Sequence, residues 1–182
     1  MSKVSGTFSV RFDLLDEDAL AAGELSPASR TVDGDDWKNA ITVTSGAAED
    51  QLDQLYAQKR NLGSSSNETL DLTDLTLLNG LNEGLNYAKI NLIYVAIPKG
   101  QTWTGDLLIG GAANPFATWL SGTVPKIVMG PMSTLFDSVF FLYRPDLAGY
   151  VVTAATADEL KIDNTDSSND VDFNLIIGGR LT

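Results

Sequence analysis

The stretch that decides the fold is Val171-Asp172-Phe173-Asn174-Leu175-Ile176-Ile177. Its odd-numbered positions are all apolar, and Asp172, Asn174 and Ile176 lie between them, which is the period of two expected of a β-strand with one buried face. The same alternation covers residues 7–14 near the N-terminus, where one face holds Phe8, Val10, Phe12 and Leu14. Strand periodicity at both ends of the chain indicates a β protein.

Short apolar segments and turn-forming residues alternate between these two stretches. Tyr87–Ile97 is apolar on nearly both faces and rich in β-branched and aromatic residues, so we expect a central strand buried on both sides. Further strands are expected at Trp37–Val43, Leu107–Ile109, Lys126–Met129, Ser138–Tyr143, Tyr150–Thr153 and Glu159–Ile162. The one helical candidate, Ala47–Lys59, fits a strand equally well. This pattern predicts an all-β, antiparallel β-sandwich that is jelly-roll-like.

The composition divides the chain into two zones. Residues 1 to 68 are polar and acidic, with charge runs at Asp13–Asp18 and Asp33–Asp36 and a linker-like stretch at Gly63–Asn67, whereas the remainder is apolar and punctuated by glycine. We predict a β-sandwich domain at residues 51–182, preceded by an extended N-terminal arm at residues 1–50. This arm can contribute a strand at residues 7–14.

The composition also excludes several classes of chemistry. The chain has 182 residues, 43% of them hydrophobic, with no cysteine and no histidine. Thiolate catalysis, disulfides, sulfur-based zinc sites and Ser-His-Asp or Cys-His arrangements therefore cannot be built. The formal net charge of −12 disfavours binding to nucleic acid or to anionic membranes. No segment approaches the roughly 20 apolar residues that cross a bilayer, and no signal peptide is expected.

Three polar motifs have an ordinary structural interpretation. Gly105–Gly111 resembles a phosphate loop but lacks the lysine and the following helix that such a loop needs. The Asp163–Asp172 loop is rich in oxygen ligands but departs from the EF-hand spacing, so whether it binds a cation stays open. The acidic run Asp13–Asp18 could hold a carboxylate pair for glycoside hydrolysis, although neighbouring acids usually form a solvated loop. No catalytic, cofactor-binding or metal-binding residue is predicted.

Aromatic residues are the candidates for a binding surface. Those in or beside loops can stack on sugars, anchor a subunit interface or fill the end of a sandwich. Ser138–Tyr143 is apolar on both faces and carries no charge, so it needs a central position or an oligomer interface to cover its second face. The candidate subunit-interface residues are Phe8, Phe12, Trp37, Trp103, Phe116, Trp119, Phe140 and Tyr143.

Seven short segments of turn and strand residues, taken in their order along the chain, carry a resemblance to a known group of proteins. They are Gln54–Leu62, Thr69–Leu72, Asn86–Ile90, Ile109–Phe116, Ala148–Ala154, Glu159–Asn164 and Asp172–Gly178. In this order the chain resembles small virion structural proteins of tailed phages over roughly residues 51–178. The resemblance brings no catalytic residues, and residues 1–50 lie outside it.

The resemblance implies a β-sandwich mounted on a phage particle. The expectation is a capsid decoration (cement) protein, made in the host cytoplasm, that binds the major capsid protein on the outside of the head. It would bridge capsid subunits as a homo-oligomer, expected to be a trimer, with the arm reaching a neighbour. A tail, neck or fibre-associated protein with a carbohydrate- or protein-binding role is the alternative. A polysaccharide-cleaving enzyme based on carboxylates is the third hypothesis.

Overall fold

A computed structural model of the chain describes residues 6–10, 39–46, 48–49, 51–74, 84–120, 127–130 and 138–181. Strands are the dominant regular elements of these residues, and their one helical element is a short 3-10 helix, η1, at Thr118–Leu120. Every ladder between their strands is antiparallel. The predicted all-β, antiparallel class is therefore confirmed. None of the described helical residues forms a helix with the length and hydropathy of a membrane span.

The chain divides into two compact units. One is Ser5–Thr44, and the other joins Ser45–Thr182 with Met1–Val4. In the first unit, β1 (Gly6–Val10) pairs with β2 (Asn39–Ser45) from Gly6 opposite Val43 to Val10 opposite Asn39. Residues 11–14 of the strand expected at 7–14 lie outside the described residues, as do residues 37–38. The extended arm at 1–50 stays a prediction.

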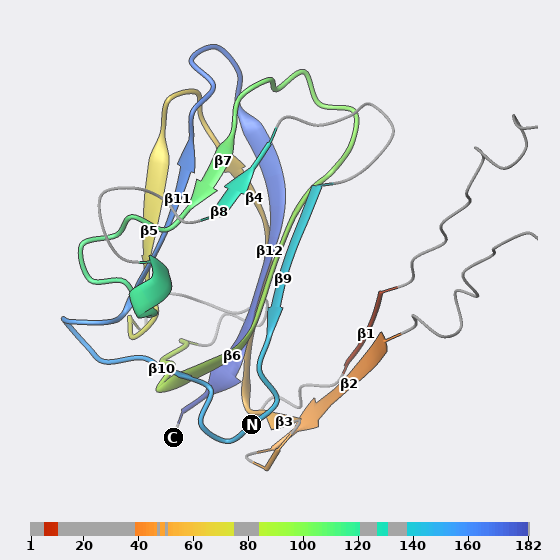
Figure 1. The fold of residues 1–182 in the computed structure, drawn as a ribbon, viewed down its shortest axis with the longest axis vertical. Helices are drawn as coiled ribbons and strands as arrows, with labels where there is room; N and C mark the ends of the chain where they lie inside the picture. Colours follow the sequence, from red (N-terminus) through yellow and green to blue (C-terminus); the bar gives the residue numbers. More distant parts are fainter. Residues whose placement is uncertain are drawn as a thin grey trace, which may run out of the picture. The chain divides into compact units, whose positions relative to one another are not determined.

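The second unit, called the body below, contains the remaining strands (Figure 1). They are β3 (Gln51–Leu52), β4 (Gln54–Leu62), β5 (Asn67–Asp71), β6 (Lys89–Ile97), β7 (Leu107–Ile109), β8 (Ile127–Met129), β9 (Ser138–Tyr143), β10 (Tyr150–Val151), β11 (Glu159–Asn164) and β12 (Val171–Arg180).

The body contains two sheets. The larger has the order β10-β6-β12-β4, and β9 also pairs with β6, while the smaller has the order β5-β11-β7-β8. If the eight longer strands are numbered along the chain without β3 and β10, the larger sheet reads 1-8-3-6 and the smaller reads 2-7-4-5. Figure 1 shows the smaller sheet on the left and the larger one to its right.

One hydrophobic core lies between the two sheets. Alternate residues of β12 (Val171, Phe173, Leu175 and Ile177) are fully buried in it, while Asp172, Asn174 and Ile176 are only partly buried, as the period of two predicts. The smaller sheet supplies alternate residues of β5, β7 and β11 to the same core. Two sheets facing each other across a shared core form a β-sandwich.

The central strand is β6. It pairs with β12 along one edge and with β9 and β10 along the other, and seven of its nine residues are buried. This confirms the expectation for Tyr87–Ile97, with the strand itself beginning at Lys89. The strands expected at Leu107–Ile109 and Ser138–Tyr143 have the predicted bounds.

Within the ambiguous stretch at 47–59, residues 51–52 and 54–59 fold as strand, in β3 and β4. The interpretation of Gly63–Asn67 as a linker is wrong. Ser66 N donates to Gly63 O at 3.2 Å, and Asn67 already begins β5. These residues therefore make a tight turn that carries the chain from the larger sheet to the smaller one.

Candidate interaction surfaces

Five of the predicted interface residues have described side chains, namely Trp103, Phe116, Trp119, Phe140 and Tyr143. Phe8 belongs to β1, where only the backbone is described. Phe12 and Trp37 lie outside the described residues. The five described residues occupy three different environments, so they do not form one patch.

Two of the five are core residues, which corrects their assignment to an interface. Trp103 and Phe116 are each 3% exposed. The indole Nε1 of Trp103 donates to Asn164 Oδ1 at 2.8 Å, so both the ring and its polar atom are satisfied inside the body. Neither residue can contact another subunit unless the core opens. Phe116 is open to two roles in the sequence, filling the core or contacting another subunit at a symmetry axis, and in the structure it fills the core.

Phe140 and Tyr143 lie on opposite faces of β9. Phe140 and Leu142 pack against the core, and strand alternation therefore places Val139, Phe141 and Tyr143 on the other side, called the outer face of the larger sheet below. Val139 is 53% exposed. Phe141 and Tyr143 are half-buried, and their rings stack with centroids 6.4 Å apart.

The outer face is apolar across several strands. Phe141 is opposite Tyr94 of β6, Tyr94 is opposite Ile176 of β12, and Ile176 is opposite Ala57 of β4. A second row runs from Val139 through Ala96 to Asn174 and Lys59. The charged residue in these two rows is Lys59 on β4, so the surface becomes more apolar from β4 toward β9.

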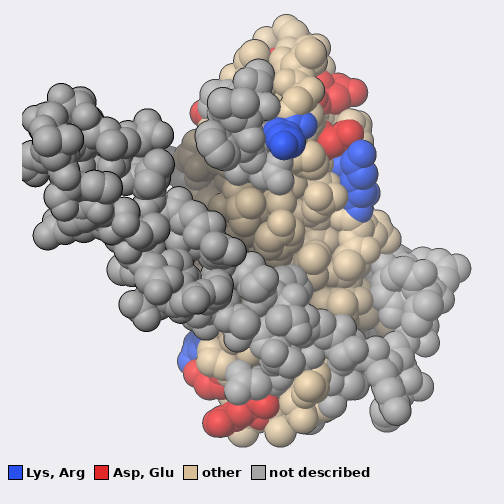
Figure 2. All heavy atoms as spheres, turned by 90° about the vertical axis from the view of Figure 1, so that its right-hand side faces the viewer, with Lys and Arg blue, Asp and Glu red and all other residues tan. Residues whose placement is uncertain are grey.

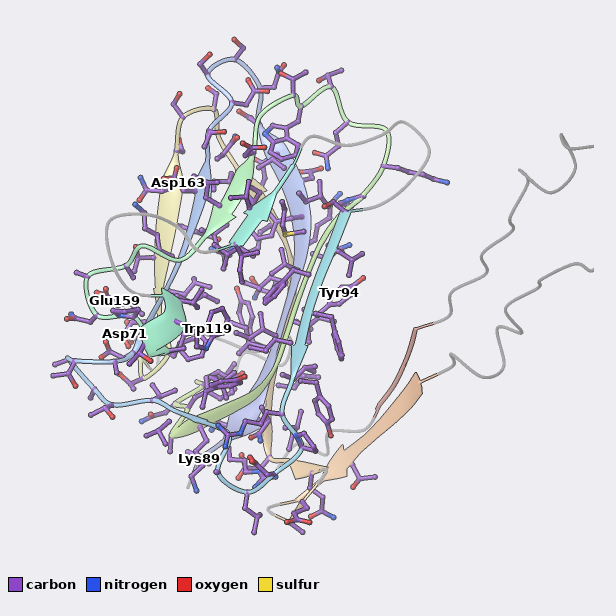
Figure 3. The ribbon with its side chains drawn as sticks, viewed as in Figure 1. Asp71, Lys89, Tyr94, Trp119, Glu159 and Asp163 are labelled. Carbon is purple, nitrogen blue, oxygen red and sulfur yellow. The ribbon has the colours of Figure 1, made fainter. Side chains whose placement is uncertain are left out.

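The exterior of the smaller sheet is polar over β5 and β11, although it continues to Leu108 of β7 and Val128 of β8. Glu159 is opposite Asp71, and Asp163 is opposite Asn67, on the side away from the core. Figure 3 shows Asp71, Glu159 and Asp163 on one side of the body and Tyr94 on the other. Figure 2 looks onto the side that carries Tyr94 and shows mostly uncharged atoms across the middle of its described surface. The two exteriors thus differ in chemical character.

Trp119 belongs to a separate aromatic cluster at the end of the sandwich that holds η1 and β10. The ring of Tyr150 is 6.2 Å from Trp119 and 6.3 Å from Phe116, centroid to centroid, with edge-to-face geometry in both pairs. The Arg144 guanidinium lies 5.4 Å from the Tyr150 centroid. Trp119 is 37% exposed, so this cluster presents one aromatic side chain to solvent.

The loop beside this cluster is held in place by hydrogen bonds. Asn91 Nδ2 donates to the carbonyl oxygens of Arg144 and Asp146 at 2.8 and 3.0 Å. Asp146 accepts from Gly149 N at 2.9 Å and from Arg144 Nε at 3.0 Å. The Gly149 amide, with a smaller contribution from Arg144, holds the pKa of Asp146 below its usual value. The aromatic cluster is therefore preorganised rather than adaptable.

The opposite end of the sandwich, called the loop corner, joins the loops at 63–66, 98–106 and 165–170. Asn164, 1% exposed, accepts from Trp103 and from Asp166 N, and donates to the carbonyls of Leu62, Gly63 and Asn169. Asp166 accepts from Thr104 N and Ser168 N, each at 2.8 Å. The Thr104 amide, followed by that of Ser168, lowers the pKa of Asp166 well below its usual range.

These contacts account for the aspartates of the Asp163–Asp172 loop. Asp166 and Asp170 accept backbone amide protons, from Thr104 and from Ser64 respectively, and Asp172 contacts Asn61 and Lys59. The carboxylates point to different partners and do not converge on a common centre. Within the described residues, no group of three or more acidic side chains is placed to hold a metal ion. The run Asp13–Asp18 lies outside the described residues.

Two buried side-chain oxygens of the described residues have no protein donor, namely Glu68 Oε1 and Asn91 Oδ1. They belong to different sheets, since Glu68 is in β5 and Asn91 in β6. The other carboxylate oxygen of Glu68 pairs with Arg60, which also donates to the hydroxyl of Tyr56 at 2.6 Å. The Arg60–Glu68 pair links β4, at one edge of the larger sheet, to β5, at one edge of the smaller sheet, and so contributes to the packing of the two sheets.

Sequence reasoning missed Tyr94, Phe141 and Ile176 on the outer face and Tyr150 beside Trp119. Tyr94 and Phe141 lie in apolar strands in which inward and outward positions look alike, so no sequence signal separates them.

No protein-family model matches the chain, and no curated protein matches it in sequence.

Proposed function

We propose that this chain is a structural protein of a virus particle, a phage capsid decoration protein that binds the outside of the head and bridges capsid subunits. The observation that carries the proposal is the apolar outer face of the larger sheet, which ends at the uncharged strand β9. In this proposal the protein acts by binding rather than by catalysis, as a homo-oligomer.

The strand order supports the proposal at the level of architecture. The strand orders 1-8-3-6 and 2-7-4-5 support a jelly-roll-like sandwich in this proposal, and jelly rolls are found in viral capsid, lectin and cupin domains. An architecture shared by so many proteins does not by itself fix a function. It agrees with the resemblance of residues 51–178 to virion structural proteins, and the choice among these classes depends on the surface.

The outer face supports the choice of a binding role. An exposed apolar strand at a sheet edge is normally protected by charge, proline or a bulge, because it otherwise pairs with other chains. The strand β9 contains neither charge nor proline, and Val139 on it is more than half exposed. A neighbouring copy or a capsid subunit that covers this face would remove the apolar surface from water.

The location of the protein on intact particles tests the proposal. Antibodies raised against the purified chain would be applied to phage particles carrying its gene and imaged by electron microscopy. We expect regularly spaced label on the head, and particles depleted of the protein should lose DNA at lower temperature. Label confined to the tail or absent from the particles would overturn the assignment to the capsid.

Two matched substitutions test the role of the outer face. Val139 on the larger sheet is 53% exposed and Val128 on the smaller sheet is 59% exposed, so Val139→Lys and Val128→Lys add the same charge at equally accessible strand positions. We expect V139K to dissociate the oligomer in light scattering and V128K to leave it intact. Equal behaviour of the two variants, or a monomeric wild type, would refute this interface.

A tail or fibre protein that binds carbohydrate is the second candidate, and the exposed Trp119 beside Tyr150 and Arg144 favours it. Trp103 and Tyr143 do not join Trp119 in such a site, because Trp103 is buried and Tyr143 stacks on Phe141. Trp119→Ala should then abolish binding on a glycan array. An array without signal for the wild type removes this candidate.

A further inference from the structure

A buried arginine fastens the segment that leads from the N-terminal unit into the body. Arg180, the last residue of β12, is 1% exposed. Its Nε donates to Gln51 O at 3.1 Å and its Nη2 to Ala48 O at 2.7 Å. These partners are main-chain carbonyls rather than a carboxylate. Burying a cation is costly unless its donors are satisfied, so this arrangement holds the 48–51 backbone firmly.

Further hydrogen bonds secure the same segment, which we call the anchor segment (the described residues 46, 48–49 and 51–53). Gly46 N donates to Leu52 O at 3.0 Å, and Ala48 N donates to Gln51 Oε1 at 3.0 Å. Asp53 makes two contacts with the end of β12: its N donates to Gly179 O at 3.2 Å, and its Oδ1 accepts from Leu181 N at 3.0 Å.

An apolar contact completes the attachment. Leu52 is 1% exposed and lies on Gly178 so closely that a Cβ at position 178 would be 2.4 Å from its Cδ1. Only glycine leaves room for this approach. The anchor segment is therefore held by a guanidinium fork, by backbone hydrogen bonds and by a side chain seated on a glycine of β12.

We infer that Arg180 is a positioning residue that anchors the root of the Ser5–Thr44 unit to the central part of the larger sheet. At its C-terminal end that unit joins the body at Ser45, immediately before the anchor segment. The strand β12, to which the segment is fastened, is paired with β6 on one side and β4 on the other. Tension that reaches the body through Ser45 therefore passes into the middle of the sheet.

The mechanical role rests on the proposed function, in which the N-terminal unit reaches a neighbouring subunit, but the anchor itself can be measured on the isolated protein. Hydrogen–deuterium exchange of the full chain would compare wild type with Arg180→Lys, which keeps the charge but lacks the planar fork. Gln51→Ala, which removes the acceptor of Ala48 N, acts on the same segment from outside the core. Arg144→Lys is the matched control in an unrelated loop.

We expect amides of residues 46–53 to exchange about tenfold faster or more in R180K, and faster also in Q51A, with β6 amides unchanged in both. R144K should match the wild type at the anchor segment. Unchanged exchange at 46–53 in both variants would overturn the anchor. Loss of protection across the whole body in both would also overturn it, because Arg180 would then be an ordinary core residue.

The second measurement uses phage particles. R180K should still bind particles but should give them less thermal protection than the wild type. If R180K loosens the anchor segment and protects particles fully, the mechanical role is wrong although the anchor exists. If the wild type does not bind particles, the proposed function fails while the exchange result stands, so the two failures are distinguishable.

Discussion

Replacing Asn164 by alanine tests whether the loop corner holds the sandwich together. The Asn164 side chain accepts two hydrogen bonds, from Trp103 Nε1 at 2.8 Å and from Asp166 N at 3.0 Å. Both donor residues are buried, so Asn164→Ala leaves two buried N–H groups without an acceptor. Each unsatisfied buried donor costs about 1–3 kcal/mol, which gives a loss of about 4 kcal/mol for the pair. This is a large part of the roughly 5–15 kcal/mol that stabilises a domain.

Guanidinium denaturation followed by circular dichroism measures this loss. With a slope of about 4 kcal/mol/M, a loss of about 4 kcal/mol lowers the midpoint by about 1 M. Asn61→Ala is the control, because Asn61 donates to Asp172 in an exposed contact between β4 and β12, and we expect a loss of under about 1 kcal/mol. A midpoint for N164A within about 0.25 M of wild type, equivalent to about 1 kcal/mol, would refute the reasoning.

Two further predictions concern acid and the packing of the loop corner. The pKa values of Asp146, Asp166 and Asp172 are lowered in the folded state, so their stabilisation is present above the unfolded pKa of about 3.9 and is lost as the pH falls below it. Calorimetry should therefore show a melting temperature that decreases once the pH is lowered past about 4. Asp166→Asn should have a lower melting temperature than the wild type at pH 7 but a smaller further decrease in acid. A decrease in acid identical to that of the wild type contradicts this. Gly105→Ala should destabilise by about 1–3 kcal/mol, because its Cβ would be 2.5 Å from Asp166 N, whereas a Cβ at Gly130 meets only Asp106 Oδ1, at an ordinary contact distance of 3.8 Å. Equal midpoints for G105A and G130A in urea would show that the close approach is relieved elsewhere.

Strands with an apolar inner face could be predicted from sequence, whereas β4 could not. The inward positions of β4 hold Tyr56, Gln58, Arg60 and Leu62, so the period-two apolar signal is interrupted in its middle. The structure explains the exception, because Arg60 lies at the sheet edge and pairs with Glu68 of β5. A polar inward position at an edge cannot be distinguished from a helical pattern until the partner strand is known.

The roles of the loop aromatics depend on contacts distant in sequence. Trp103 and Trp119 both follow a threonine and precede or enter a loop, yet one is buried and the other exposed. Trp103 is buried at the loop corner, where β11 brings Asn164 against its Nε1. Trp119 packs against Tyr150 at the other end of the sandwich and stays 37% exposed. The local sequence contains neither contact, so it predicts the same role for Trp103 and Trp119.

The way the described body uses its polar groups bears on the choice between binding and catalysis. A catalytic site presents polar side chains with unfulfilled hydrogen-bonding capacity to a substrate. At the loop corner, Asn164 and Asp166 direct theirs to the protein's own backbone, and at the aromatic end Asp146 does the same. The row from Phe141 to Ile176 on the outer face is instead apolar except for the phenol of Tyr94, so it presents mainly shape and hydrophobic area. A surface of this kind favours association with another protein, and rigid ends keep its strands in the register that association requires.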